Sequence, residues 1–110
     1  MEIKDLQQQI IKFRDDRNWE QFHSLKDLML GLNIEQGELG ELFLWKSQAE
    51  IETISKKEIA NEIADIFIFL TYITTHFDID LEKAIIEKIA INEKKYPVEK
   101  SYGSNKKYDL

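Results

Sequence analysis

The chain has 110 residues, contains no cysteine and carries 21 acidic against 15 basic side chains, which gives a formal net charge of -6. This length predicts one domain with a modest core, the acidity argues against binding to duplex nucleic acid, and the lack of cysteine excludes disulfides and thiolate metal sites. Residues 1–5 are not typical of a secretion signal and no apolar stretch is long enough to span a bilayer, so we expect a cytoplasmic protein without a membrane partner.

Apolar residues recur three and four positions apart along most of the chain, which predicts an all-α fold. The first predicted helix carries an apolar stripe made of Ile3, Leu6, Ile10 and Phe13. Ser24, with Asp27 three residues later, resembles a weak capping box and starts the second predicted helix at about Leu25. This second helix is expected to end at about Trp45 or Lys46.

Residues 47–53 lack a clear apolar face and are predicted to form a connector. Ser55 with Glu58 is a better capping box and begins a third helix, which is expected to reach about His76. This helix is apolar around most of its circumference over residues 66–73, and one small bundle cannot cover such a surface. We therefore expect a four-helix-type bundle that assembles as a homodimer or homotetramer.

A fourth helix is expected to begin after Asp78 or Asp80 and to end at Pro97, because proline disfavours helical geometry in the residue before it. The polar residues that follow are typical of an extended tail. The predicted organisation is thus a helical domain over residues 1–97 and a polar C-terminal tail over residues 98–110.

Two pairs of carboxylates interrupt the apolar stripes of the second and third predicted helices. Glu35 falls within the leucine stripe of the second helix, and Glu38 lies about 60° away at the usual 100° per residue. Glu62 and Asp65 hold similar places on the third helix. Carboxylates turned toward apolar surroundings need compensation, which a hard cation such as Mg²⁺, with Mn²⁺ as a substitute, supplies. E-x-x-E spacing is also common on solvated helix faces, but the position of both pairs favours a metal site.

Four segments of the chain resemble the MazG-like all-α nucleoside triphosphate pyrophosphohydrolases, and within them the dCTP pyrophosphatase-like branch. These segments are residues 13–23, 35–46, 62–65 and 88–97. E-x-x-E followed by E-x-x-D is the metal signature of the family, while the tryptophan of the first segment and the Asn-x-x-x-Tyr-Pro ending are similar to this branch. The resemblance implies a helical dimer or tetramer that uses magnesium to hydrolyse nucleoside triphosphates to monophosphate and pyrophosphate.

The resemblance and the carboxylate pattern point to the same chemistry, in which water attacks the α-phosphorus and pyrophosphate leaves. The metal ligands are then Glu35, Glu38, Glu62 and Asp65. Glu41 lies near the same flank as Glu38, and these two residues are the candidates for the catalytic role of orienting or deprotonating the water. Glu41 is alternatively an ordinary exposed glutamate.

The candidates for binding the phosphates or the sugar follow in the fourth predicted helix and its end. They are Lys88, Asn92, Lys95 and Tyr96. A solvated helix face is the alternative for the two lysines, whereas Asn92 and Tyr96 match the family ending.

Base recognition is expected to use Trp19 and Trp45, because aromatic faces stack on bases with modest selectivity; each is alternatively a core residue. His23 either reaches the substrate or caps the start of the second helix. The branch sometimes carries a polar residue where this chain has Ile10, so the preference for dCTP or for modified and noncanonical deoxynucleotides stays open.

Two other interpretations stay open. One is a related enzyme that acts on dUTP or phosphoribosyl-ATP, which could share the helical metal site. The other is a non-enzymatic helical interaction module whose acidic pairs provide only solubility. Replacing Glu35 by Leu or Gln would be neutral or stabilising in such a module, but would abolish the activity of a metal enzyme.

Overall fold

The structure is a computed structural model that describes residues 1–107, and these residues form helices, turns and loops without a strand. The predicted all-α fold is therefore confirmed. The chain divides into two compact units, Met1–Asp78 and Ile79–Leu110, which we describe separately. Within the described residues, no helix combines the length and the apolar character that crossing a membrane requires.

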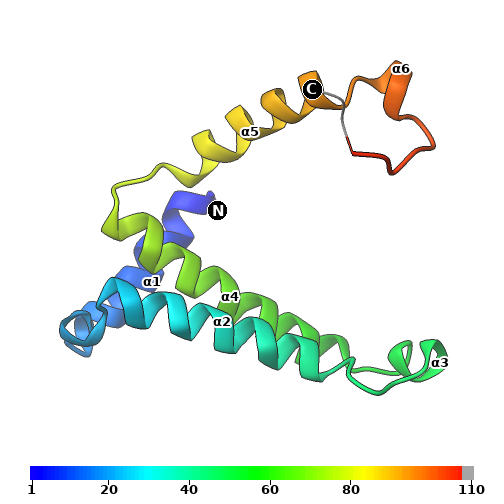
Figure 1. Ribbon diagram of the computed structural model, residues 1–110. Coiled ribbons are helices and arrows are strands. Elements are labelled where there is room, and N and C mark those ends of the chain that lie inside the picture. Colours follow the sequence, from blue (N-terminus) through cyan, green and yellow to red (C-terminus); the bar gives the residue numbers. More distant parts are fainter. Residues whose placement is uncertain (108–110) are drawn as a thin grey trace. The chain divides into compact units, whose positions relative to one another are not determined.

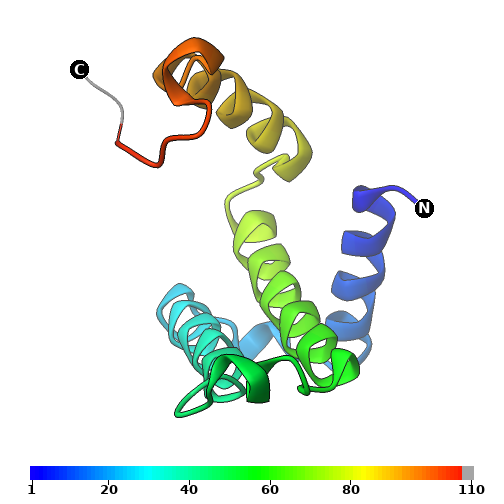
Figure 2. The ribbon, with the colours of Figure 1, turned by 90° about the vertical axis from the view of Figure 1, so that its right-hand side faces the viewer.

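The first unit is built on two long helices, α2 (Leu25–Glu41) and α4 (Lys56–His76), with α1 (Ile3–Asp16) packed against α4. Figure 1 shows α2 and α4 side by side with opposite chain directions, and Figure 2 shows the same pairing from another side. The core of this unit is small, and its buried side chains include Leu28, Leu32, Thr71 and Tyr72. The pairing of α2 with α4 is the element that positions the candidate site.

The backbone of α2 and the side chains of α4 approach each other closely at Gly31 and Phe69. A Cβ atom on Gly31 would lie 2.7 Å from Cζ and 3.2 Å from Cδ1 of Phe69. Real Cβ contacts are not that short, so only glycine leaves room for the aromatic ring where it stands. The absence of a side chain at residue 31 thus determines how near the two helices pack.

The start of α2 agrees with the prediction, but its end does not. The Ser24 hydroxyl accepts a hydrogen bond from the Asp27 N–H at 3.2 Å, as a capping residue does. The helix ends at Glu41, whereas Trp45 or Lys46 was expected. Beyond Glu41 the backbone hydrogen bonds span three residues, because the Phe43 N–H donates to the Gly40 carbonyl at 3.0 Å. Trp45 then adopts a left-handed φ of 63°.

The links between the long helices contain two short helical turns. A 3₁₀ turn, η1 (Glu20–Phe22), lies between α1 and α2. The segment predicted as a connector contains a short helix, α3 (Gln48–Ile51), because Ser47 and Glu50 form a capping box. The Ser55 hydroxyl accepts the Glu58 N–H at 3.4 Å, and α4 runs to His76 as predicted.

The second unit contains α5 (Leu81–Lys95), which Asp80 caps by accepting the Lys83 N–H at 3.1 Å. It also contains α6 (Val98–Ser101), so the prediction of a wholly extended tail was wrong. Pro97 begins α6 because its φ of -61° is already suitable for a helix start. The last part of the predicted tail, residues 108–110, lies outside the described residues.

The first unit leaves much apolar surface uncovered. On α2, Met29 and Ile34 are exposed, and on α4 the same is true of Ile63 and Leu70. Within residues 66–73, however, Leu70 is the one exposed residue, and the others are half-buried or buried. Because α5 belongs to the other unit, the four-helix-type bundle and its assembly as a dimer or tetramer stay predictions.

Candidate metal and nucleotide site

The carboxylates predicted to bind metal meet between α2 and α4. One oxygen atom from each of Glu35, Glu62 and Asp65 lies within 4.8 Å of the other two. The first of these residues comes from α2 and the other two come from α4, so the antiparallel pairing of the two helices creates the cluster. Residues far apart in the sequence thus present three oxygen donors to one small volume.

Two oxygens of this cluster are buried without a hydrogen-bond partner among the described residues, Oε2 of Glu35 and Oε2 of Glu62. Burial of Glu35, the hydrogen bond and charge of Glu38, and the charges of Asp65 and Glu62 raise the pKa of Glu35 to about 7. Burial and the neighbouring carboxylates, Glu38 first among them, also raise the pKa of Glu62. A cation bound between these groups would pair with the two buried oxygens and would offset the mutual repulsion of the carboxylates.

The donor set suits a hard divalent cation. Mg²⁺ prefers carboxylate oxygens, retains several waters and is commonly held by a few carboxylates together with substrate phosphates. The chain has no cysteine, and no histidine belongs to the cluster that the described residues form. The residues present therefore fit magnesium, with Glu35, Glu62 and Asp65 as the converging ligands.

Glu38 and Glu41 lie at the border of this cluster rather than within it. Both are exposed on α2. Glu38 acts on the pKa of Glu35 and of Glu62 through hydrogen bonding and charge, and the charge of Glu41 also raises the pKa of Glu62. Both carboxylates are therefore close enough to act on a group bound between the helices.

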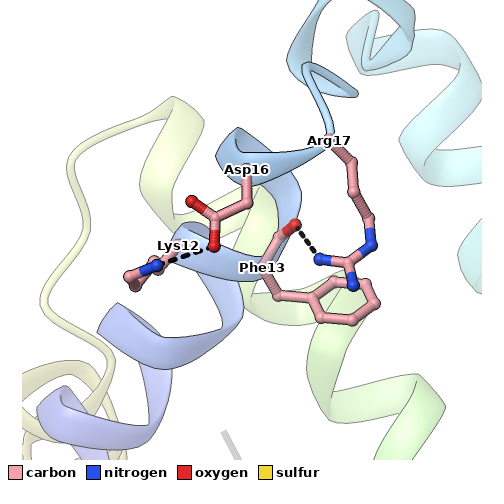
Figure 3. A network of polar contacts seen from close by, with 4 residues as sticks. All are labelled: Lys12, Phe13, Asp16 and Arg17. Atoms are coloured by element: carbon pink, nitrogen blue, oxygen red, sulfur yellow. Dashed lines mark hydrogen bonds and ion pairs between the residues drawn. The ribbon is translucent and has the colours of Figure 1, made fainter.

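Trp19 lies beside α1 in a small group of aromatic and cationic side chains. Its ring meets the ring of Phe13 edge to face, with centroids 5.7 Å apart. The guanidinium of Arg17 lies 3.6 Å from the centre of the Phe13 ring and donates a hydrogen bond to the Phe13 carbonyl at 2.9 Å (Figure 3). A salt bridge of 2.7 Å between Lys12 and Asp16 joins neighbouring turns of the same helix end.

Trp45 is 91% exposed and follows the other end of α2. Trp19 precedes this 17-residue helix, which at 1.5 Å per residue spans about 25 Å. The two tryptophans of one chain are therefore too far apart to hold the same base between them.

His23 is half-buried, and its ring packs against an aromatic side chain. Its ring centre is 4.5 Å from that of Tyr72, and its Nδ1 atom is buried without a partner among the described residues. Burial lowers the pKa of His23, the charge of Arg14 lowers it further, and Glu20 opposes this. The residue lines a cavity of about 200 Å³ with Arg14, Glu20 and Tyr72.

The four candidates for phosphate or sugar binding lie in the second unit. Lys88 and Asn92 are exposed on α5, Lys95 is half-buried at its end, and Tyr96 follows it. The Tyr96 N–H donates to the Asn92 carbonyl at 2.8 Å, which ties these two residues to the same turn.

An apolar groove of about 300 Å³ between α1 and α4 was not predicted. Its lining includes Leu6, Ile10, Phe13, Ile68 and Tyr72. The first apolar stripe, which contains Leu6, Ile10 and Phe13, carried the signal, but its spacing does not show that one side stays open. Because Phe13 contacts Trp19, the groove continues the aromatic group at the end of α1.

The chain is similar to several known proteins. The model of the MazG-like family matches residues 30–110. The chain is 37% identical to dCTP pyrophosphatase 1 from Rattus norvegicus, over 96% of this chain and 65% of the relative, and 35% identical to dCTP pyrophosphatase 1 from Homo sapiens over the same shares. The chain thus spans about two thirds of the length of these relatives, at 65%.

A solved structure also resembles the chain. It is a pyrophosphatase from Archaeoglobus fulgidus DSM 4304, with a TM-score of 0.78 and 34% identity, and the match covers 86% of this chain and 92% of that one. The family match, over residues 30–110, spans the positions of Glu35, Glu38, Glu62 and Asp65. The chain belongs to the MazG-like family, as its motifs indicated.

Proposed function

We propose that this chain hydrolyses deoxynucleoside triphosphates to the monophosphate and pyrophosphate in the presence of Mg²⁺. The observation that carries the proposal is the convergence of Glu35, Glu62 and Asp65 around buried oxygens that lack partners. The names of the relatives support the reaction, and they favour dCTP as substrate. Such an enzyme would act in the cytoplasm on the pool of free nucleotides.

In the proposed mechanism, Glu35, Glu62 and Asp65 would hold magnesium, which would supply positive charge to neutralise the phosphates and the departing pyrophosphate. Glu38 and Glu41 lie at the border of the cluster, where one of them accepts a proton from the attacking water. The oxygen of this water bonds to the α-phosphorus while the bond from that phosphorus to the bridging oxygen of the β-phosphate breaks. Glu41, which is exposed at the end of α2, is the candidate general base, and Glu38 helps to hold the cluster.

Substrate contacts beyond the cluster are assigned by residue type and by the family motif. Asn92 and Tyr96, which share one turn at the end of α5, bind the sugar, while Lys88 and Lys95 bind phosphate oxygens. His23 is assigned a structural role, because its ring packs against Tyr72 and its Nδ1 atom is buried.

Base recognition in this proposal requires two copies of the chain. Trp19 and Trp45 lie at opposite ends of α2, so a base can stay between them only if one comes from each subunit. The exposed apolar residues of α2 and α4, Ile34 and Ile63 among them, provide the surface for that assembly. We therefore propose a homodimer or homotetramer in which Trp19 and Trp45 of the partner subunit face the same base.

The test is pyrophosphate release from a panel of ribo- and deoxynucleoside triphosphates, with Mg²⁺ and with a chelator. Wild type is compared with Glu35→Gln and with Glu52→Gln, which removes the same charge from an exposed position. We expect magnesium-dependent release that is lost in the first variant and retained in the second. Absence of release from every nucleotide by a folded oligomer would disprove the proposal and favour phosphoribosyl-ATP or a non-enzymatic interaction module.

A further inference from the structure

The end of the second unit has a charge opposite to that of the chain. Residues 94–107 contain five lysines and one acidic residue, Glu99, whereas the whole chain has a formal net charge of -6. One third of all Lys and Arg residues thus lie in this short segment. A local excess of positive charge on an acidic protein attracts anions to that place.

The five lysines surround a cavity. The end of α5 and the segment after it enclose about 210 Å³, and the lining contains Lys94, Lys95, Lys100, Lys106 and Lys107, with hydroxyl groups from Tyr96, Ser101 and Ser104. Figure 1 shows the chain leaving α5, forming α6 and looping back toward the end of α5. Apart from Pro97, the lining that residues 1–107 provide consists of side chains with cationic or hydroxyl donors, and no acidic side chain of these described residues belongs to it.

The backbone holds this loop in place. The N–H groups of Lys100 and Ser101 both donate to the Pro97 carbonyl at 3.0 Å, which forms the turn of α6. Gly103 has a φ of 74°, a left-handed conformation that reverses the chain at little cost in a glycine. The Ser104 N–H then bonds to the Ser101 carbonyl at 3.0 Å and the Lys106 N–H bonds to the Ser104 hydroxyl at 3.2 Å.

Helix electrostatics do not explain all of these lysines. Lys94 and Lys95 lie in the last turn of α5, where positive charge is favoured by the carbonyl end of the helix. Lys100 lies in the last turn of the four-residue α6, whereas Lys106 and Lys107 lie in no helix. None of these last three lysines forms an ion pair within residues 1–107. Three like charges around one cavity repel each other, and a multivalent anion would reverse that cost.

We propose that this lysine cavity binds a condensed phosphate, that is, inorganic pyrophosphate or the β- and γ-phosphates of a nucleoside triphosphate. A condensed phosphate carries several negative charges and many acceptor oxygens on a compact group, which matches several ammonium and hydroxyl donors around a small cavity. The inference deepens the proposed function, on which it rests for the identity of the anion. It adds Lys100, Lys106 and Lys107 to the phosphate-binding residues expected from the sequence.

The first experiment measures binding of inorganic pyrophosphate to the full chain by calorimetry, in chelator and at low salt, where the carboxylate cluster holds no metal. The variant is Lys100→Gln/Lys106→Gln/Lys107→Gln. The matched control is Lys12→Gln/Lys26→Gln/Lys83→Gln, which also removes three charges from exposed positions in the chain. Circular dichroism establishes that all the proteins have the same helix content.

We expect the cavity variant to bind pyrophosphate at least about tenfold more weakly than wild type, and the control to stay within about twofold, since each control lysine already pairs with a carboxylate. Replacing the same three cavity lysines by arginine retains the charge and should retain binding. Equal losses in variant and control, or no pyrophosphate binding by folded wild type, would overturn the inference. An oligonucleotide or polyglutamate that binds wild type more tightly than pyrophosphate does, and that loses this binding in the lysine-to-glutamine variant, would also overturn the inference, in favour of that partner.

A second experiment distinguishes substrate from product. In steady-state hydrolysis with Mg²⁺, a higher KM with unchanged kcat assigns the cavity to the triphosphate, whereas a higher inhibition constant for pyrophosphate alone assigns it to the product. If neither constant changes in an active enzyme, the inference fails while the proposed function stands. If wild type hydrolyses no triphosphate, the proposed function fails, and the calorimetric comparison alone decides whether the cavity binds pyrophosphate.

Discussion

Glu35 of α2 and Glu62 of α4 each place a buried, unpartnered Oε2 atom in one cluster whose ligand oxygens lie within 4.8 Å of one another. Two like charges at this separation repel and have lost part of their hydration, so their proximity costs free energy in the metal-free protein. A protein retains such a pair only where another group compensates for it. The pair therefore connects the stability of the fold with the occupancy of the site.

Metal binding should raise thermal stability through this pair. We expect Mg²⁺ to raise the Tm of wild type in a concentration-dependent way, because a ligand that binds only the folded state stabilises it by mass action. Glu35→Gln should lose this shift and should be more stable than wild type in chelator, because one repelling charge is gone. Glu52→Gln serves as control and should retain the shift. A Tm that ignores Mg²⁺ in wild type would contradict the metal assignment.

The pH dependence of stability should have an unusual sign below neutrality. The pKa of Glu35 is about 7 in the folded chain against 4.5 for the ordinary side chain. The folded state therefore holds an extra proton between these two values, and the contribution of this group to stability falls as the pH rises from about 4.5 to about 7.

Calorimetric unfolding in chelator between pH 5 and 8 measures this effect. The Tm of wild type should fall more steeply with pH than that of Glu35→Gln, and saturating Mg²⁺ should remove the difference in slope. Parallel slopes for the two proteins in chelator would show that this carboxyl has an ordinary pKa.

The close approach of Gly31 and Phe69 predicts opposite effects of the same substitution at two positions of α2. Gly31→Ala places a Cβ atom 2.7 Å from Phe69 Cζ and should lower the free energy of unfolding by about 1–3 kcal/mol, the usual cost of overpacking. Gly37→Ala meets nothing within 4 Å and should raise it by about 0.5–1 kcal/mol, because alanine favours the helix. Urea unfolding of both variants checks the pair, and equal effects would refute the packing argument.

Trp45 should separate stability from activity. Its φ of 63° is costly for a residue with a side chain, so Trp45→Gly should leave the free energy of unfolding unchanged or raise it by up to about 1 kcal/mol. If the ring stacks on the base, the same change should lower kcat/KM by about five- to a hundredfold, given 1–3 kcal/mol per stacked base. Trp45→Ala is the matched comparison, since it removes the ring but retains the backbone strain. An active glycine variant would remove Trp45 from the site.

Much of the fold was predictable because it depends on local signals. The caps at Ser24 and Ser55 were predicted from residue type and spacing, and each accepts the expected backbone hydrogen bond. Of the two candidates for the fourth helix, Asp78 and Asp80, the structure selects Asp80. The end of α2 was not predictable, since apolar residues continue to Trp45 and only tighter backbone bonding after Gly40 ends the helix. Apolar periodicity shows which face of a helix is buried, but it is a poor guide to the residue at which the backbone hydrogen-bond pattern changes and the helix ends.

The acidic cluster was predictable for a different reason. A carboxylate within an apolar stripe is energetically costly, and this cost is visible in Glu35 without knowledge of the fold. The lysine cavity gave no such signal, because exposed lysines are common on any polar segment. Its geometry depends on the return of the chain at Gly103, and a return of that kind depends on backbone conformation rather than on a periodic pattern.

The contact between Gly31 and Phe69 also bears on which ion the cluster accepts. Gly31 is one helical turn before Glu35 on α2, and Phe69 is one turn after Asp65 on α4. The spacing of the helices at this contact therefore influences how far apart the carboxylates of Glu35 and Asp65 lie. Mg²⁺ requires ligand distances of about 2.0–2.1 Å, whereas Ca²⁺ accepts about 2.3–2.6 Å. If the cluster binds a cation as proposed, a side chain at residue 31 would widen the gap between the helices and would shift selectivity from the smaller cation to the larger one.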